Sequence, residues 1–193
     1  MIKKDKRARK TVRSIQDTLL RMLCRTQMRK IHIVDLCTEA DINRTTFYLH
    51  FRGLEDVLAS LRQEIVENIF ERGTDDVIDF DMPRNPLPFL TICTDVLASY
   101  EGLGEFVRLS ADADMFLTQL KNEFASHIFS RYTQARGAIG GDALCVFRFL
   151  TAGVLDCYTE WLKSDRRVPF EEVLGTCAPI VSAGQKVLAR TAR

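Results

Sequence analysis

Apolar residues recur along most of the chain at intervals of three and four positions, which places them on one face of an α-helix. The first such stripe predicts a helix near residues 8–25 and consists of Val12, Ile15, Leu19, Met22 and Leu23. Alternating apolar and polar runs, which mark strands, are weak, and no Asn-Gly or Asp-Gly hairpin turn lies between such runs. The pattern therefore predicts an all-α protein.

Two short helices separated by a tight turn are expected next. The first covers residues 32–39, and the turn ends at Asn43. Asparagine is a good N-cap, because its side-chain oxygen accepts a hydrogen bond from a free amide of the following turn. The second short helix is the octapeptide RTTFYLHF, residues 44–51. Its Phe47 and Phe51 are four positions apart and therefore share one face.

A longer fourth helix is predicted over residues 54–72. Gly53 is a permissive N-cap before it, and Gly73 ends it. The segment 74–88 then carries three of the five prolines together with four aspartates. Such a composition indicates a linker or loop between two working parts of the chain.

Five further helices are expected, over residues 87–100, 103–110, 114–136, 142–164 and 170–190. The 142–164 segment is apolar on nearly all sides, which is typical of a helix buried on several faces. About nine helices are thus predicted in all. We expect a helix-turn-helix DNA-binding domain at 1–54 and a helical regulatory and dimerisation domain at 55–193, connected by the helix over 54–72.

Charge is distributed unevenly between these two parts. Residues 1–54 hold 13 Lys and Arg against 5 Asp and Glu, whereas residues 55–193 hold 14 against 21. The overall net charge of +1 therefore hides a basic N-terminal quarter and an acidic remainder. A basic end favours contact with nucleic acid, although charge alone does not separate DNA from RNA or from an anionic membrane.

Several classes of protein are disfavoured by composition. No uncharged apolar run approaches the roughly 18 residues of a transmembrane helix, and the basic N-terminus precedes an amphipathic segment, unlike a secretory signal. The six cysteines form no C-x-x-C pair, and the three histidines lack metal-ligand spacing. We therefore expect a cytoplasmic protein with reduced cysteines, no bound metal, no cofactor and no contact with a membrane.

Residues 32–50 have the layout of a DNA-binding helix-turn-helix, in which the second helix enters the major groove. Phe47 and Phe51 would anchor that helix, and its outward side chains would meet the DNA. Arginine can read guanine, threonine can contact a base edge, and tyrosine or histidine can reach phosphate oxygens. The predicted DNA-binding residues are His32, Asn43, Arg44, Thr45, Thr46, Tyr48 and His50, with Lys10 on the adjacent backbone.

The stretch KIHIVDLCTEADINRTTFYLHFRGLEDVL, residues 30–58, resembles the N-terminal domain of the tetracycline-repressor (TetR/AcrR) family of bacterial transcription regulators. The resemblance rests on IHI, LC, ADIN, TFYLHF and GLEDVL, and it covers about the first 60 residues. Three positions depart from the family pattern. Asp41 stands where glycine is usual, His32 where threonine is usual, and Leu54 where lysine is usual. Aspartate tolerates a left-handed backbone better than most residues, so the turn is expected to survive.

The resemblance implies a homodimer whose last two long helices, about 142–164 and 170–190, form a four-helix interface. It also implies a pocket for an unknown small-molecule effector in the C-terminal part. The residues considered for that pocket are Phe89, Cys93, Phe106, Phe124, His127, Phe147, Thr151 and Tyr158. Ordinary core packing is the alternative for each of them, because aromatic residues at helical spacing usually belong to a core.

Two functions remain open from the sequence. The first is a sequence-specific, ligand-responsive transcriptional regulator, a repressor that binds a near-palindromic double-stranded DNA operator as a homodimer. The alternative is a helical protein-interaction module that keeps the fold with weak or no operator binding, which the missing lysine at position 54 favours. An enzyme is not expected, because the sequence has no glycine-rich phosphate loop, metal cluster or Ser/His/Asp arrangement.

Overall fold

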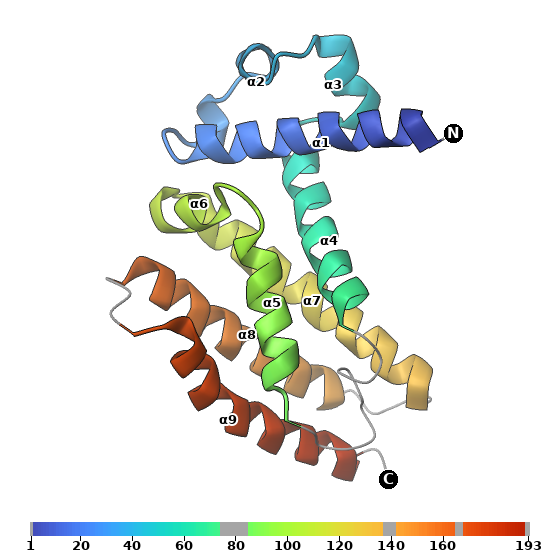
Figure 1. Cartoon of the computed structure of the whole chain (residues 1–193), viewed down its shortest axis with the longest axis vertical. Coiled ribbons are helices and arrows are strands. Elements are labelled where there is room, and N and C mark those ends of the chain that lie inside the picture. The colour runs from blue at the N-terminus through green and yellow to red at the C-terminus, as the bar shows by residue number, and fades with distance from the viewer. Residues whose placement is uncertain (1, 74–84, 137–141, 165–167, 192–193) are drawn as a thin grey trace.

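The computed structural model describes residues 2–73, 85–136, 142–164 and 168–191, with the side chains of 2–6, 136, 142 and 188–191 left out. Within these ranges the chain forms nine α-helices and one short 3-10 helix, without a strand, so the all-α prediction is confirmed (Figure 1). The elements are α1 (Ile2–Leu23), η1 (Met28–Lys30), α2 (Ile33–Glu39), α3 (Arg44–His50), α4 (Leu54–Arg72), α5 (Leu87–Ala98), α6 (Leu103–Leu109), α7 (Ala113–Arg136), α8 (Asp142–Lys163) and α9 (Phe170–Thr191). No helix in the described ranges is both long enough and apolar enough to cross a bilayer.

The predicted helices match the observed ones closely, with two differences near the N-terminus. The helix α1 begins at Ile2 rather than near residue 8. Its first turns are rich in lysine and arginine, which form helices well but leave no apolar stripe to detect. The 3-10 helix η1 was also not predicted. Most of the predicted linker, residues 74–84, lies outside the described residues.

The helices are arranged around α4, which joins the two ends of the molecule (Figure 1). The helix α1 crosses the top of α4 and carries α2 and α3 on its far side. Below it, α5, α7, α8 and α9 run along the lower part of the molecule. The main packing pairs there are α7 with α4, α8 with α7, and α9 with α8.

One continuous cluster of buried apolar side chains extends from α1 to α9. The helix α4 lies at its centre and buries Val57, Leu58, Leu61, Arg62, Ile65, Val66, Ile69 and Phe70. The buried guanidinium of Arg62 is paired with the Glu123 carboxylate of α7 at 2.8 Å. That ion pair ties α4 to α7 within an otherwise apolar contact.

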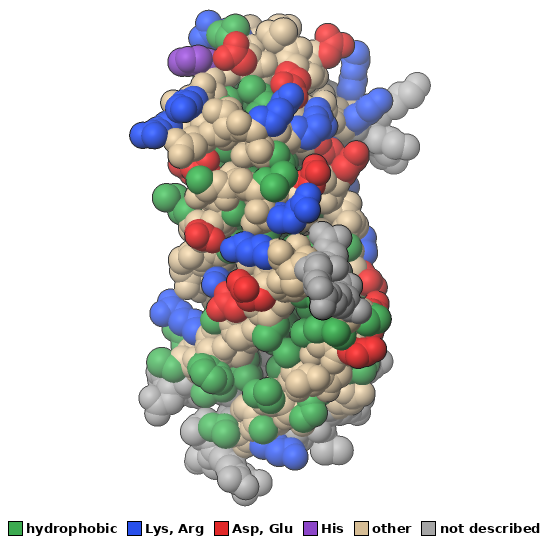
Figure 2. Space-filling model, turned by 90° about the vertical axis from the view of Figure 1, so that its left-hand side faces the viewer, with side chains coloured by type: hydrophobic (Ala, Val, Ile, Leu, Met, Phe, Trp, Pro, Cys, Tyr) green, Lys and Arg blue, Asp and Glu red, His purple; other side chains and the backbone are tan. Residues whose placement is uncertain are grey.

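The helix α8 is buried on fewer sides than its composition predicted. Phe147, Tyr158 and Leu162 are buried, but Phe149 on another face is 73% exposed. Cys145, Gly153 and Cys157 are exposed too, and together with Phe149 they recur every four positions along that face. The side of the molecule on which α8 and α9 lie gathers hydrophobic side chains in its lower half (Figure 2). A single copy of the chain therefore leaves this apolar surface uncovered.

The crossing of α8 and α9 depends on a residue without a side chain. A Cβ atom on Gly184 of α9 would lie 2.8 Å from the Cδ1 atom of Leu150 on α8. Carbon atoms do not approach so closely, so a larger residue at 184 would displace Leu150 or separate the two helices.

The turn between α2 and α3 contains the left-handed backbone that was expected at Asp41, whose φ is 53°. Its amide nitrogen is 3.3 Å from the carbonyl oxygen of Thr38, and the Ile42 amide donates to the carbonyl of Cys37 at 3.0 Å. Aspartate thus replaces glycine here without loss of the turn.

Replacement of Asp41 by a β-branched residue should weaken the fold, because such residues resist left-handed backbone. We expect Asp41→Val to lower the free energy of unfolding by about 1–2 kcal/mol. Asp41→Gly should stay within about 1 kcal/mol of the parent, since glycine adopts the conformation freely but gains freedom in the unfolded chain. Urea unfolding followed by circular dichroism measures both, and equal losses in the two variants would contradict the conformational explanation.

Candidate functional site

The helix-turn-helix is built from α2, the Asp41 turn and α3. His32 is the N-cap of α2 with extended backbone, and its side chain makes no capping hydrogen bond. Asn43 is the N-cap of α3, as predicted, and its Oδ1 accepts from the Thr46 amide at 2.7 Å and from the Thr46 hydroxyl at 2.9 Å. The second bond occupies the Thr46 hydroxyl within the cap.

The inner face of α3 is held by two phenylalanines, as the spacing predicted. Phe47 is fully buried and Phe51 is 4% exposed, and their ring centroids are 5.9 Å apart. The Tyr48 ring meets Phe47 edge-on at 5.4 Å while remaining half exposed. These contacts fix the rotation of α3 about its own axis and so determine which side chains face outward.

The outer face of α3 exposes most of the predicted residues. Arg44, Thr45 and Tyr48 are exposed, whereas Thr46 and His50 are half-buried. Leu49, which was not among the predicted residues, is 76% exposed. Its position, two residues after the buried Phe47, was a sufficient signal, because two helical steps turn a side chain to the opposite face.

Two predicted contacts lie outside α3. His32 is exposed at the start of α2, and Lys10 is exposed on α1. Because α1 begins at Ile2, Lys10 lies on a helix and not on an extended arm. Arg7 and Arg9 of the same helix are also exposed, so this end of α1 carries positive charge.

A polar network joins α1 to α4 and to the segment after α5. Gln16 is fully buried, and its amide nitrogen is within hydrogen-bond distance of the Ser60 hydroxyl at 3.4 Å and the Glu64 carboxylate at 3.3 Å. Arg13 is 3.6 Å from Glu64, and its guanidinium lies 4.3 Å from the centre of the Tyr100 ring. We call Arg13, Gln16, Ser60, Glu64 and Tyr100 the polar joint.

Burial changes the acidity of groups in and beside the polar joint. Burial raises the pKa of the Tyr100 hydroxyl to about 12, and the nearby Glu64 carboxylate adds to the effect. Burial also raises the pKa of Asp17 above its ordinary value, although the Arg13 guanidinium opposes the shift. Tyr100 therefore keeps its proton at neutral pH, and its hydroxyl donates to a Glu64 oxygen at 3.3 Å.

Three of the eight residues considered for an effector pocket gather around Phe70 of α4. The His127 ring stacks on Phe70 at 4.4 Å, and Phe124 and Phe89 contact Phe70 at 5.3 and 5.9 Å between centroids. We call Phe70, Phe89, Phe124 and His127 the aromatic cluster. It joins the C-terminal end of α4 to α5 and α7.

The other five candidates are not members of the aromatic cluster. Phe106 is fully buried against Phe116, Phe147 packs on Tyr132, and Tyr158 packs on Trp161 and Phe170. Cys93 is partly buried in α5, and burial raises the pKa of its thiol to about 12. Thr151 is half-buried in α8. The eight residues thus do not form one aromatic cluster, and their role in an effector pocket stays a prediction.

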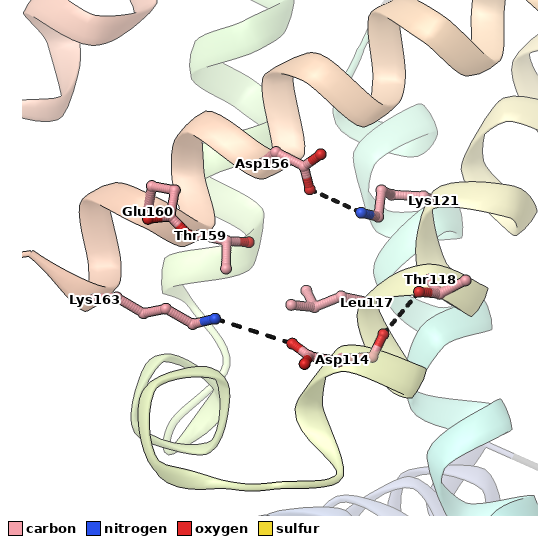
Figure 3. A pocket seen from close by; sticks show the side chains of 8 residues that line it. All are labelled: Asp114, Leu117, Thr118, Lys121, Asp156, Thr159, Glu160 and Lys163. Atoms are coloured by element: carbon pink, nitrogen blue, oxygen red, sulfur yellow. Dashed lines mark hydrogen bonds and ion pairs between the residues drawn. The ribbon is translucent and has the colours of Figure 1, made fainter.

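A groove of about 240 Å³ lies elsewhere, between α7 and α8 (Figure 3). Its walls are charged: Lys121 pairs with Asp156 at 2.7 Å, and Lys163 lies 3.9 Å from Asp114. The opposed charges neutralise one another across the groove, which suits helix packing better than an apolar ligand. None of the eight predicted pocket residues lines it.

The thiols and histidines of the described residues form no metal-binding group of three or more ligands. The Cys177 pKa is raised by burial and by the neighbouring Cys157 thiol, with which it is in hydrogen-bond contact between α8 and α9. All six cysteines are free.

Known proteins were compared with the chain in three ways. No family model matches the sequence. No curated protein matches it either. Two solved structures share its fold over nearly the whole length. A TetR transcriptional regulator from Streptococcus agalactiae is 21% identical with a TM-score of 0.61, covering 93% of this chain and 98% of that one. A TetR-family transcriptional regulator from Syntrophomonas wolfei is 18% identical with a TM-score of 0.56, covering 94% and 95%.

The His127 environment predicts a pH dependence of stability. Burial is the main cause that lowers the pKa of His127 below its ordinary 6.5, and the positive charge of Arg131 is the second. The Glu67 carboxylate opposes the shift. Below pH 6.5 the unfolded chain binds a proton that the folded chain resists, so acidification costs stability. The loss between about pH 7.5 and about pH 5.5 should be smaller in His127→Phe than in the parent.

Chemical denaturation at several pH values measures this difference. His32→Gln is the matched control, because His32 is exposed. An unchanged pH profile in His127→Phe would show that this imidazole does not contribute.

Proposed function

We propose that this chain, which has the fold of the TetR-family transcriptional regulators, binds a near-palindromic operator as a homodimer and represses transcription in response to a small molecule. The observation that carries the proposal is the outer face of α3. Its exposed side chains are held in place by buried phenylalanines on the inner face and by the Asn43 cap.

The exposed face of α3 suits the major groove in size and chemistry. A single α-helix fits that groove, and side chains at the outer face then reach base edges. Arg44 supplies guanidinium donors, Thr45 a hydroxyl and a methyl group, and Tyr48 a phenolic hydroxyl. His32 and His50 lie at the margins, where phosphate contacts position a helix without reading sequence.

The positive end of α1 supports the same orientation. Lys10 is exposed beside the helix-turn-helix, and residues 1–54 carry an excess of Lys and Arg. Each phosphate neutralised by such a side chain strengthens binding to any sequence and makes it depend on salt. Lys10 is thus assigned a positioning role on the DNA backbone.

The uncovered surface of α8 and α9 supports dimerisation. We call Phe149 of α8, with Ile180 and Val187 of α9, the apolar stripe; these side chains are 73%, 59% and 47% exposed. Soluble proteins rarely leave contiguous apolar surface open, and such patches mark interfaces. A two-fold axis through this surface would pair α8 and α9 with their copies in a four-helix contact.

Dimerisation places two α3 helices on one DNA molecule. The half-sites of the operator should then lie about one helical turn apart, roughly 34–36 Å, or a multiple of that distance. An effector acts by favouring a dimer in which this separation no longer matches the DNA.

The aromatic cluster is the proposed site of effector action. It contacts the far end of α4, whose middle adjoins α1 through Gln16 and Glu64. A molecule that enters between Phe70, Phe89 and Phe124 would shift α4, and α4 would carry the shift to the DNA-binding end. The polarity of the groove between α7 and α8 makes it the less suitable place for an apolar effector.

Selection of bound fragments from random double-stranded DNA tests the operator. At about 150 mM salt, where generic charge attraction is weakened, we expect an enriched palindrome. On that DNA, Arg44→Ala should lose about 1–3 kcal/mol of discrimination at one base pair of each half-site. Lys10→Ala should weaken all sequences alike and lower the salt slope by about one.

If Arg44→Ala loses the same affinity for specific and for random DNA, then Arg44 does not read a base. A folded dimer that enriches no sequence would contradict operator binding and favour the protein-interaction module instead.

Disruption of the apolar stripe should separate the dimer. Phe149→Glu places a carboxylate in the proposed interface, and we expect the dissociation constant to rise by about 30-fold or more. Sedimentation velocity at micromolar concentration measures this change. Met115→Glu is the matched control, because Met115 is a 61% exposed apolar residue of α7 outside the stripe. A parent protein that sediments as a monomer, or an undisturbed Phe149→Glu dimer, would contradict the interface.

A further inference from the structure

Leu49 has the highest exposure among the large apolar side chains of the described residues. It is 76% exposed, more than Phe149 at 73% or Met115 at 61%. Exposed leucine gains nothing from folding, since its apolar surface stays in water. An exposed leucine in the last turn of α3 therefore points to a surface that becomes covered on binding.

The rotation of α3 places Leu49 at the centre of the outer face. Successive helical residues are about 100° apart, so Thr45 and Leu49 each lie about 200° from the buried Phe47. These two residues are four positions apart and form the outermost ridge of the helix. Thr46 and Tyr48, about 100° from Phe47, lie at the sides, and Arg44 and His50, about 60° from it, lie nearer the inner face. Thr45 and Leu49 are accordingly the side chains that enter the groove most deeply.

A leucine at that place reads DNA through apolar contact alone. Of the groups exposed in the major groove, only the C5-methyl group of thymine is apolar; the others are hydrogen-bond donors and acceptors. We infer that Leu49 is a specificity-determining residue that contacts a thymine C5-methyl group in each half-site, with the methyl group of Thr45 beside it. This inference rests on the proposed function and names what the operator contains.

The charges around the ridge favour DNA as its occupant over an apolar protein partner. Exposed basic side chains surround the helix-turn-helix at Lys10, Arg29, Lys30, Arg44 and Arg52. Asp35, Asp41 and Glu55 are exposed there too, whereas Glu39 is paired with Arg25 at 2.7 Å, so the basic side chains outnumber the other acidic ones. An apolar centre inside a basic rim complements the methyl groups and phosphates of a duplex.

Replacement of thymine by deoxyuridine removes the methyl group and nothing else, so it tests the contact directly. Each thymine of the enriched operator is replaced in turn, symmetrically in both half-sites, and binding is measured by fluorescence anisotropy at fixed salt. Loss of one buried methyl group corresponds to a roughly fourfold change in affinity. The parent protein should therefore bind roughly 15-fold more weakly when the contacted thymine is replaced in both half-sites.

The variant Leu49→Ala should bind the thymine and deoxyuridine operators equally at that position. Leu109→Ala is the matched control, because Leu109 is 54% exposed and belongs to α6, a helix on the opposite side of α1 from α3 (Figure 1). It should keep the parent's preference for thymine. Since Leu49 is exposed, its replacement should leave the melting temperature unchanged, which separates lost contact from lost fold.

The outcomes distinguish this inference from the proposed function. If a palindrome is enriched but no deoxyuridine substitution weakens binding, or if Leu49→Ala keeps the full preference for thymine, the Leu49 contact is overturned and operator binding stands. If the parent protein enriches no sequence at all, the proposed function fails and the Leu49 contact fails with it.

Discussion

The two ends of the molecule share one helix, α4, and the rest of the structure depends on this constraint. In its first half and at its middle, α4 packs on α1, and Ser60 and Glu64 approach the buried Gln16 there. It also packs on α5 and α7, where Arg62 pairs with Glu123 and Phe70, near the end of α4, stacks on His127. A helix of 19 residues with apolar contacts along its length moves as one body. A displacement at either end must therefore reach the other.

The polar joint gives this arrangement a defined register. Apolar contacts carry no directional preference, whereas a buried amide is costly unless its hydrogen-bond partners stay in place. Gln16 accordingly holds α1 at one position along α4, and Arg13 holds it against Tyr100. We regard these groups as the means by which α1, and with it α2 and α3, keeps one orientation relative to the body.

Features that depend on neighbours in sequence were predictable, and those that depend on distant residues were not. Helical spacing, the Asn43 cap and the left-handed Asp41 all follow from a few adjacent residues, and each is present. The exposure of Leu49 also followed from helix geometry, but only outward polar residues were predicted to bind DNA. The aromatic cluster had no such signal, because its rings come from three helices. The eight candidate pocket residues were chosen by type, and type does not determine which helices meet.

Two hydrogen bonds join the N-terminal helices to distant loops. The Met28 amide donates to the Asp112 carboxylate at 2.9 Å, and Arg13 donates to the Ser99 carbonyl at 3.3 Å. Both acceptors lie in the turns on either side of α6, far from residues 1–54 in sequence. Residues 1–54 are therefore not an interchangeable unit. A chimera that grafts another protein's first 54 residues onto this body would lose both bonds unless the donor supplied matching groups, whereas exchange of the outer residues of α3 alone would keep them.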